Sequence, residues 1–304
     1  MVGSWFIYLR IKESNLDLVL DKISVALAEH WLALFFVLVL MPINWGLEAY
    51  KWRYLLRFFQ KMSFGQSFMA TLAGLGVSIW IPLRMGEYLG RMVYLKPKKR
   101  IKGVIATIAG NFTQLSVTVF MGVQAFSRYG KDLLPDYLQN IPLHFFMLVF
   151  VVGILVSLLS IQRIPAILPI QNWPKAIRIG LKSLYFYAPS VLLTALGWSF
   201  LRYMVFGLQF FLALMAFGID LSLWEATLYI PLIYFTQSFI PVMAIFELGI
   251  RVAVSIYFLS SFSGDDALIL AAGTFIWLIN IILPGLVGWL LLFFAKKEDK
   301  NTKS

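Results

Sequence analysis

The chain has 304 residues, of which 60% are hydrophobic and only 13% are charged. An ordinary soluble domain carries about 25% charged residues and its core is too small for so many apolar side chains, so a water-soluble enzyme is excluded. Long apolar runs separated by short charged stretches predict an all-α polytopic membrane protein. The strands of a membrane barrel would instead alternate in polarity over segments of about 10 residues.

Charge and composition also restrict the partners. The chain has 26 Lys and Arg residues against 15 Asp and Glu residues, a net charge of +11. No basic helix with interleaved aromatic residues accompanies this excess, so we expect no nucleic-acid partner. Cysteine is absent, the two histidines (His30 and His144) are far apart, and motifs for nucleotide binding, serine hydrolysis and zinc proteolysis are missing. We therefore expect no cofactor and no metal site.

In chain order, the first predicted element is an amphipathic helix at the membrane interface, over residues 14–30. Seven apolar segments of helical length follow it, and two shorter segments that carry charge are expected to be helical as well. The long segments are 31–56, 64–82, 103–127, 143–161, 186–217, 222–240 and 267–294, and the short ones are 84–95 and 246–262.

A proline-containing basic stretch, 163–182, predicts an interfacial linker that divides the chain into two halves. The domain organisation that we expect follows from this division. It consists of an interfacial amphipathic segment (1–30), a first repeat (31–127), the spanning helix 143–161 with the interfacial linker (together 128–182), a second repeat (183–295) and a cytoplasmic basic tail (296–304).

The two halves share a pattern that indicates duplication. Ser63 precedes Pro82 by 19 residues, and Ser222 precedes Pro241 by the same interval. Each proline is followed by a glutamate and, four residues after it, an arginine: Glu87 with Arg91, and Glu247 with Arg251. Transporters are often built from two repeats of this kind.

The distribution of basic residues predicts the orientation of the repeats. The stretches 51–61, 96–102 and 163–182 and the tail are basic, whereas the intervening loops are neutral or acidic. The positive-inside rule places all four in the cytoplasm, with a cytoplasmic C-terminus, if 84–95 and 246–262 both cross the membrane. The repeats are then inverted. A twelve-residue helix is only about 18 Å long against about 30 Å of hydrocarbon, so these segments are expected to be broken or re-entrant helices.

Charged side chains within these segments are the candidate binding residues. A charge at membrane depth costs at least about 3 kcal/mol, a cost tolerated when the charge is paired or used. One interpretation is a structural Glu–Arg ion pair in each repeat. The other is an arginine that holds an anionic lipid headgroup through its planar donor fork. The candidate headgroup-binding residues are Arg84, Glu87, Arg91, Arg202, Glu247 and Arg251.

Two polar stripes at helical spacing accompany these charges. They either make hydrogen bonds between helices or line a hydrated polar groove. Arg202 lies alone in a long apolar stretch, and Glu48 or a lipid phosphate are its candidate partners. The expected groove residues are Asn44, Glu48 and Lys51 on the first stripe and Asn111 and Gln114 on the second, which also contains Thr107 and Thr118.

Three motifs of this chain resemble the lysylphosphatidylglycerol-synthase transmembrane, or flippase-like, family, which includes the membrane half of the multiple peptide resistance factor. The motifs are Asn44–Ala49 with Lys51–Leu56, Pro82-x-Arg84-x-Gly86-Glu87 with Arg91, and Pro241 followed by Glu247-x-Gly249-x-Arg251. The resemblance covers about residues 30–295. It implies handling or translocation of lipids with polar headgroups. In fused members a separate soluble domain performs aminoacyl transfer, and we expect no such domain in this chain.

These observations predict a multi-pass protein of the cell inner membrane that moves a phospholipid or a polyprenyl-phosphate-linked lipid, with the headgroup passing through a polar groove. Without a nucleotide-binding motif, movement would be downhill or ion-coupled, and Glu87 and Glu247 are candidate proton carriers. Two alternatives stay open. One is a membrane transferase acting on a lipid-linked sugar or phospholipid. The other is a non-transporting scaffold for a separate transferase partner.

Overall fold

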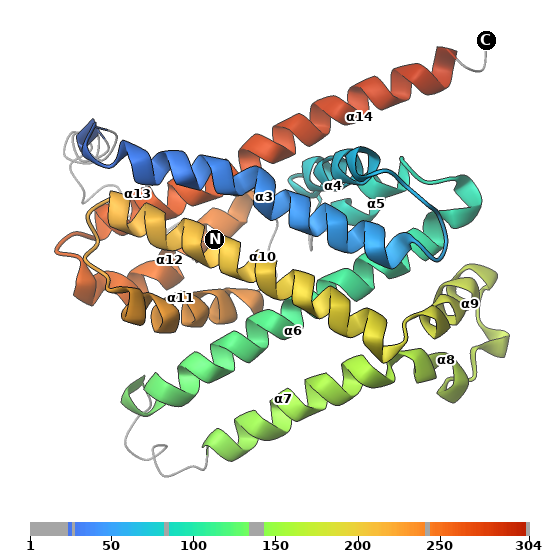
Figure 1. Ribbon diagram of the computed structural model, residues 1–304, viewed down its shortest axis with the longest axis horizontal. Coiled ribbons are helices and arrows are strands. Elements are labelled where there is room, and N and C mark those ends of the chain that lie inside the picture. The colour runs from blue at the N-terminus through green and yellow to red at the C-terminus, as the bar shows by residue number, and fades with distance from the viewer. Residues whose placement is uncertain (1–23, 26–27, 82–84, 134–142, 241–243, 302–304) are drawn as a thin grey trace. The chain divides into compact units, whose positions relative to one another are not determined.

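The computed structural model describes residues 24–25, 28–81, 85–133, 143–240 and 244–301, and in these ranges the chain is helical with no strands. The predicted interfacial helix at 14–30 therefore lies mostly outside the described residues, as does the candidate residue Arg84. Figure 1 traces the helices in chain order from α3 to α14. The all-α prediction is confirmed.

Four helices in the described part of the chain are long and apolar enough to cross a membrane. A fifth span results if Leu148–Ser157 and Ile161–Ile167, bent by 49° at their junction, count as one. These helices confirm a polytopic membrane protein. The four are Trp31–Leu56 (α3), Pro97–Arg128 (which includes most of α6, Arg100–Leu133), Pro189–Ala216 (α10) and Asp266–Phe293 (α13 through α14).

Most of the remaining helices begin close to the residues that the sequence predicts, and two short helices, Ile164–Ile167 and Lys175–Lys182, lie within the predicted linker 163–182. Ser63 and Ser222 are N-caps, and each accepts a hydrogen bond from the backbone N–H three residues on. Asp265 caps α13 by accepting from the Ala267 N–H at 2.9 Å. These helices are α4 (Phe64–Ser78), α5 (Gly86–Met92), α7 (Leu143–Ser160), α8 (Ile164–Ile167), α9 (Lys175–Lys182), α11 (Leu223–Ser238), α12 (Ala244–Leu259), α13 (Asp266–Trp277), the π-helical turn η8 (Leu278–Ile282) and α14 (Leu283–Asn301).

The chain forms two compact units that interleave along the sequence. Unit 1 contains Met1–Ile43, Thr118–Met147 and Met204–Ile282, and therefore the helices α11, α12 and α13. Unit 2 contains Asn44–Val117, Leu148–Tyr203 and Leu283–Ser304, and therefore α4, α5, α8, α9 and α14. The long helices α3, α6, α7 and α10 each contribute to both units. The predicted domain boundaries and the inverted relation of the repeats stay predictions.

In unit 2, α4 and α5 form a closely packed antiparallel hairpin. Gly86 lies against the backbone of Ser78, and Gly90 lies against the backbone of Ala73, so α5 returns along α4. Helix α14 packs on α4 in the same way, with Gly288 against Leu72 and Gly285 against the Ile79 side chain. Small residues let helix backbones approach this closely in membranes. The second arm of the hairpin thereby brings Glu87 and Arg91 into the interior of unit 2.

The basic stretches of unit 2 lie at one end of this hairpin. The Gln60 side chain, which follows α3, donates to the Tyr94 carbonyl and accepts from the Lys96 N–H. Helix α9 packs through Gly180 on Ile101 and Ile105 near the start of α6. The stretches 51–61, 96–102 and 163–182 are thus neighbours, an arrangement consistent with the predicted placement of these loops on one side of the membrane.

Unit 1 contains a second helix pair, α11 and α12. Gln237 near the end of α11 donates to the Arg251 carbonyl of α12 at 3.5 Å, and Gly122 of α6 packs on the Phe235 ring. The Tyr234 ring stacks on Phe206 with centroids 5.0 Å apart. The tyrosine hydroxyl donates to the Phe206 carbonyl at 3.2 Å. An aromatic surface from α10 and α11 therefore borders the charged residues of α12.

Candidate anion-binding sites in the two units

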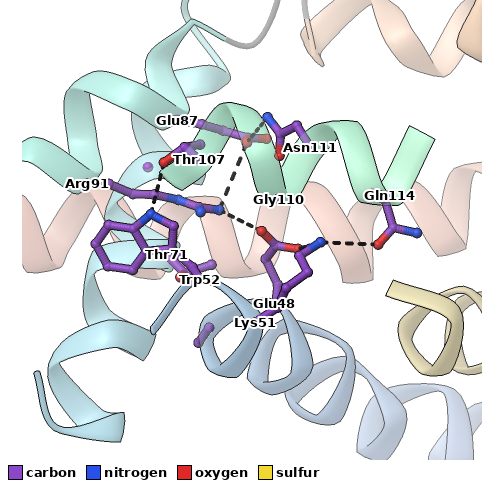
Figure 2. Close-up of polar contacts among 12 residues, drawn as sticks. Glu48, Lys51, Trp52, Thr71, Glu87, Arg91, Thr107, Gly110, Asn111 and Gln114 are labelled. Atoms are coloured by element: carbon purple, nitrogen blue, oxygen red, sulfur yellow. Dashed lines mark hydrogen bonds and ion pairs between the residues drawn. The ribbon is translucent and has the colours of Figure 1, made fainter. Parts of the chain in front are cut away.

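Glu48 on α3 is the centre of a buried ion-pair network in unit 2. Its carboxylate lies 2.8 Å from Lys51 Nζ, 3.1 Å from Arg91 Nη2 and 3.3 Å from Arg202 Nη1. The three cations come from three different helices, because Arg91 belongs to α5 and Arg202 to α10. Glu48 is only 3% exposed. Figure 2 shows the carboxylate between Arg91 and Lys51. Of the two partners expected for Arg202, the structure supplies Glu48.

The expected Glu87–Arg91 pair is present, but Arg91 lies closer to Glu48. The distance from Arg91 Nη2 to Glu87 Oε2 is 4.0 Å, against 3.1 Å to Glu48 Oε1. Glu87 also accepts a hydrogen bond from Asn111 Nδ2 of α6 at 3.3 Å (Figure 2). The first repeat therefore links its Glu–Arg pair to α3 and α6. We call Glu48, Lys51, Glu87, Arg91 and Arg202 the Glu48 cluster.

The two predicted polar stripes meet beside this cluster. Gln114 Oε1 accepts from Lys51 Nζ at 3.5 Å and from Arg202 Nη1 at 3.4 Å. The Gln114 amide donates to the Ser199 carbonyl at 3.3 Å, which turns its oxygen toward the cations. Nearby, the Trp52 indole donates to Thr107 Oγ1 at 2.9 Å. The stripes make hydrogen bonds between helices here, and Asn44 of the first stripe is buried with them.

The matching pair in unit 1 is simpler. Arg251 Nη2 lies 2.9 Å from Glu247 Oε1 on the same helix, and the guanidinium lies over the Phe206 ring at 5.4 Å. Arg251 is 3% exposed, whereas the Glu247 side chain is 17% exposed. Within the described residues no second carboxylate pairs with Arg251.

Arg91 and Arg251 use their guanidinium groups in the same way. Each directs Nη2 to carboxylate oxygen and lies over an aromatic ring, Trp52 at 5.3 Å or Phe206 at 5.4 Å. In each, the buried Nε and Nη1 atoms have no hydrogen-bond partner among the residues that the structure describes. Buried donors of a charged group are costly when they make no hydrogen bond. In each site, the Nε and Nη1 atoms of the arginine can therefore donate hydrogen bonds to an oxygen atom of a bound ligand.

The charges of the Glu48 cluster do not cancel. Its three cations face two carboxylates, which leaves one excess positive charge among the described residues of this interior. A buried uncompensated charge is unfavourable, and a bound anion would remove the excess. Arg202 is the most accessible cation of the cluster, with 18% of its side chain exposed. In the described ranges, no group of three His, Cys, Asp or Glu side chains could hold a metal ion.

The sequence missed several residues that shape these sites. Ser199, Trp45 and Trp52 contact the charged side chains in unit 2, as Phe206 does in unit 1, and Thr113 contacts Ser199. Ser199 lies three residues before Arg202 on α10, and this helical spacing is the signal that could have identified it. The aromatic residues gave no such signal, because Trp and Tyr in a membrane protein more often lie at the interfaces.

Comparison with known protein families decides the classification. The family model described as "Lysylphosphatidylglycerol synthase TM region" matches residues 2–288. The chain belongs to this family. No curated protein and no solved structure matches the chain. Membership of the lysylphosphatidylglycerol synthase TM region family implies a function related to membrane lipids, consistent with the resemblance that the motifs around Glu48 and Arg91 indicate.

Proposed function

We propose that this protein moves a lipid with a polar, anionic headgroup across the membrane. The observation that carries the proposal is the shared state of Arg91 and Arg251. Each is a buried arginine that keeps two nitrogens without a hydrogen-bond partner among the described residues. A phosphate oxygen is the ligand that best satisfies such donors. The acyl chains would stay in the bilayer while the headgroup visits these sites.

The predicted residues take different parts in this proposal. Arg251 and Arg91 contact the headgroup directly, whereas Glu247, Glu48 and Glu87 hold the guanidinium groups in place through their ion pairs. Arg202 is the entry point to the Glu48 cluster, because more of its side chain is exposed than of Arg91 or Lys51. Asn44, Asn111 and Gln114 complete the polar lining of unit 2. Arg84 keeps its proposed role from the motif alone.

The sharpest test removes a charge pair without leaving a buried charge behind. In Glu247→Gln/Arg251→Gln both partners become neutral and keep a similar length, so the fold tolerates the change better than it would a single substitution. The assay follows a fluorescent phosphatidylglycerol in phosphatidylcholine proteoliposomes that contain the full chain. We expect transport to fall by at least about tenfold, because charge-assisted hydrogen bonds to the headgroup are lost. Arg163→Gln, at an exposed arginine, is the matched control.

If the folded double variant transports lipid as fast as the wild type, the Glu247–Arg251 pair has only a structural role. This result would overturn the proposed headgroup contact. The same samples also distinguish the two alternative functions, a membrane transferase and a non-transporting scaffold. Chromatography of the labelled lipid would reveal a covalent change if the protein were a transferase. A stoichiometric soluble partner on purification, with no lipid movement by the protein alone, would instead favour a scaffold.

A further inference from the structure

Lys51 is the buried residue whose protonation state the Glu48 cluster can change. Its side chain is 1% exposed, and three oxygen atoms surround the ammonium group. They are Glu48 Oε2 at 2.8 Å, Ser199 Oγ at 3.2 Å and Gln114 Oε1 at 3.5 Å. An ammonium group has three protons to donate, so these three acceptors match its charged form.

The same surroundings also suit a neutral amine. Thr113 Oγ1 donates to the Gly110 carbonyl at 2.8 Å, so the Ser199 hydroxyl, 3.0 Å away, donates to Thr113 when Lys51 is charged. If Lys51 loses a proton, the Ser199 hydroxyl can rotate and donate to the amine lone pair, while Glu48 and Gln114 receive the two remaining N–H groups. Thr113 then loses the hydrogen bond from Ser199 but keeps its own hydrogen bond to the Gly110 carbonyl, so the neutral state leaves no described polar group at Lys51 without a partner.

The other charged groups that face Lys51 cannot relieve the excess charge. Arg91 of α5 and Arg202 of α10 keep their protons at any pH at which the fold persists. Protonation of Glu48 on α3 or Glu87 on α5 would enlarge the positive excess. The groups that α6 contributes at this point, Gln114 and Thr113, do not titrate. Loss of the Lys51 proton is therefore the remaining way to neutralise the cluster when no anion is bound.

We propose that Lys51 is a proton-binding site coupled to the anion, so that the cluster takes up a proton together with each anionic headgroup. This inference rests on the proposed function. When the anion is bound, it and the two carboxylates together balance the three cations, and Lys51 stays protonated. When the anion leaves, the uncompensated positive charge favours loss of the Lys51 proton, which passes to the aqueous buffer, and Lys51 becomes a neutral amine. A monoanionic headgroup and its proton then enter the cluster without net charge transfer.

The test measures protons taken up during binding of a soluble monoanionic lipid. The purified full chain is titrated with dihexanoylphosphatidylglycerol in a calorimeter, in two buffers with different heats of ionisation, from mildly acidic to mildly alkaline pH. We expect proton uptake per bound lipid to rise from zero toward one as the pH increases. Affinity should fall by at most about tenfold per pH unit over the same interval, as linkage to one proton requires. Dihexanoylphosphatidylcholine is the zwitterionic control.

Two substitutions assign the proton to Lys51. Lys51→Arg keeps the positive charge but cannot release it, so the variant should bind with no proton uptake and with an affinity independent of pH. Glu225→Gln removes a carboxylate at the α11 cap, outside the Glu48 cluster, and should leave binding and proton uptake as in the wild type. If Lys51→Arg does not fold, Lys51→Gln replaces it, and it should bind more weakly and also without proton uptake.

The possible outcomes separate this inference from the proposed function. Absence of binding by the wild-type chain would overturn both. Binding that takes up no proton at any pH would overturn only the coupling, and so would uptake that persists in Lys51→Arg. Uptake that disappears in Glu225→Gln would also overturn the assignment to Lys51, because that carboxylate lies outside the cluster. Uptake that disappears only when Lys51 is replaced supports the proposal.

Discussion

Glu48 connects helices that are far apart in the sequence. Its carboxylate contacts Lys51 on its own helix, Arg91 from α5 and Arg202 from α10. The helical spacing placed Glu48 and Lys51 on one polar stripe, and the isolation of Arg202 predicted Glu48 as one of its two candidate partners. The contact with Arg91 was not predictable, because α5 supplies its own glutamate at the favourable i,i+4 spacing. Only the packing of α5 against α3 brings Arg91 closer to Glu48 than to Glu87.

The Glu48 carboxylate is expected to be the most important single group for the stability of unit 2. Glu48→Gln leaves three cations with one remaining carboxylate in a buried setting, so the free energy of unfolding should fall by about 3–5 kcal/mol. Thermal unfolding in detergent, followed by intrinsic fluorescence, measures the change. Glu225→Gln is the matched control, because it places at the α11 cap the residue that already caps α4 at Gln66. Equal unfolding temperatures for the two variants would contradict the assignment.

The helix pairs α4–α5 and α11–α12 show which features of a helix the sequence pattern predicts and which it does not. Ser63 and Ser222 marked the starts of α4 and α11, and the break near each following proline was expected from the motif. The close approach of α4 and α5 was not expected. Gly86 and Gly90 permit backbone contact between these two helices, a role that the sequence pattern did not indicate. A glycine in a sequence does not reveal whether it breaks a helix or permits close packing.

Gly90 should therefore tolerate no side chain. A Cβ atom there would meet the backbone of Ala73 and Gly74, which cannot move aside as a flexible side chain could. We expect Gly90→Ala to destabilise the protein by about 1–3 kcal/mol through overpacking. Gly197→Ala is the control, because nothing lies within 4 Å of the added atom and alanine favours the helix. A thermal-shift comparison checks the pair, and equal stability would show that α5 does not pack as described.

For the molecule as a whole, the sequence predicted the positions of the long apolar helices, whereas the grouping of the helices into compact units was not predictable from it. The positions of the apolar segments agree with α3, α4, α6, α7, α10, α11 and α13–α14. The division into repeats at 163–182 stays a prediction, and the compact units interleave along the sequence, because α3, α6, α7 and α10 each contribute to both. Sequence order cannot reveal such interleaving, since it depends on contacts between distant segments.

The orientation of the chain can be tested directly, because it has no cysteine of its own. We expect single cysteines at the exposed positions Lys98 and Lys175 to react with a membrane-impermeant maleimide only when the cytoplasmic face is accessible. A cysteine at Asp220, also exposed, should react from the opposite face. Labelling of whole cells and of inverted membrane vesicles separates the two. Reaction of Lys98→Cys and Asp220→Cys from the same face would refute the predicted topology.

The glycine-mediated packing of α14 on α4 also has a mechanical consequence. Gly76, Gly285 and Gly288 bring the helices so close that the backbone of one fills the groove of the other. Sliding or rotation of α14 would force these backbones into collision, so α4, α5 and α14 should shift as a single rigid body. A fluorophore attached after the end of α14 would therefore move together with the α4–α5 hairpin, which carries Arg91. Its displacement on adding lipid would report motion at the buried charges from outside the membrane.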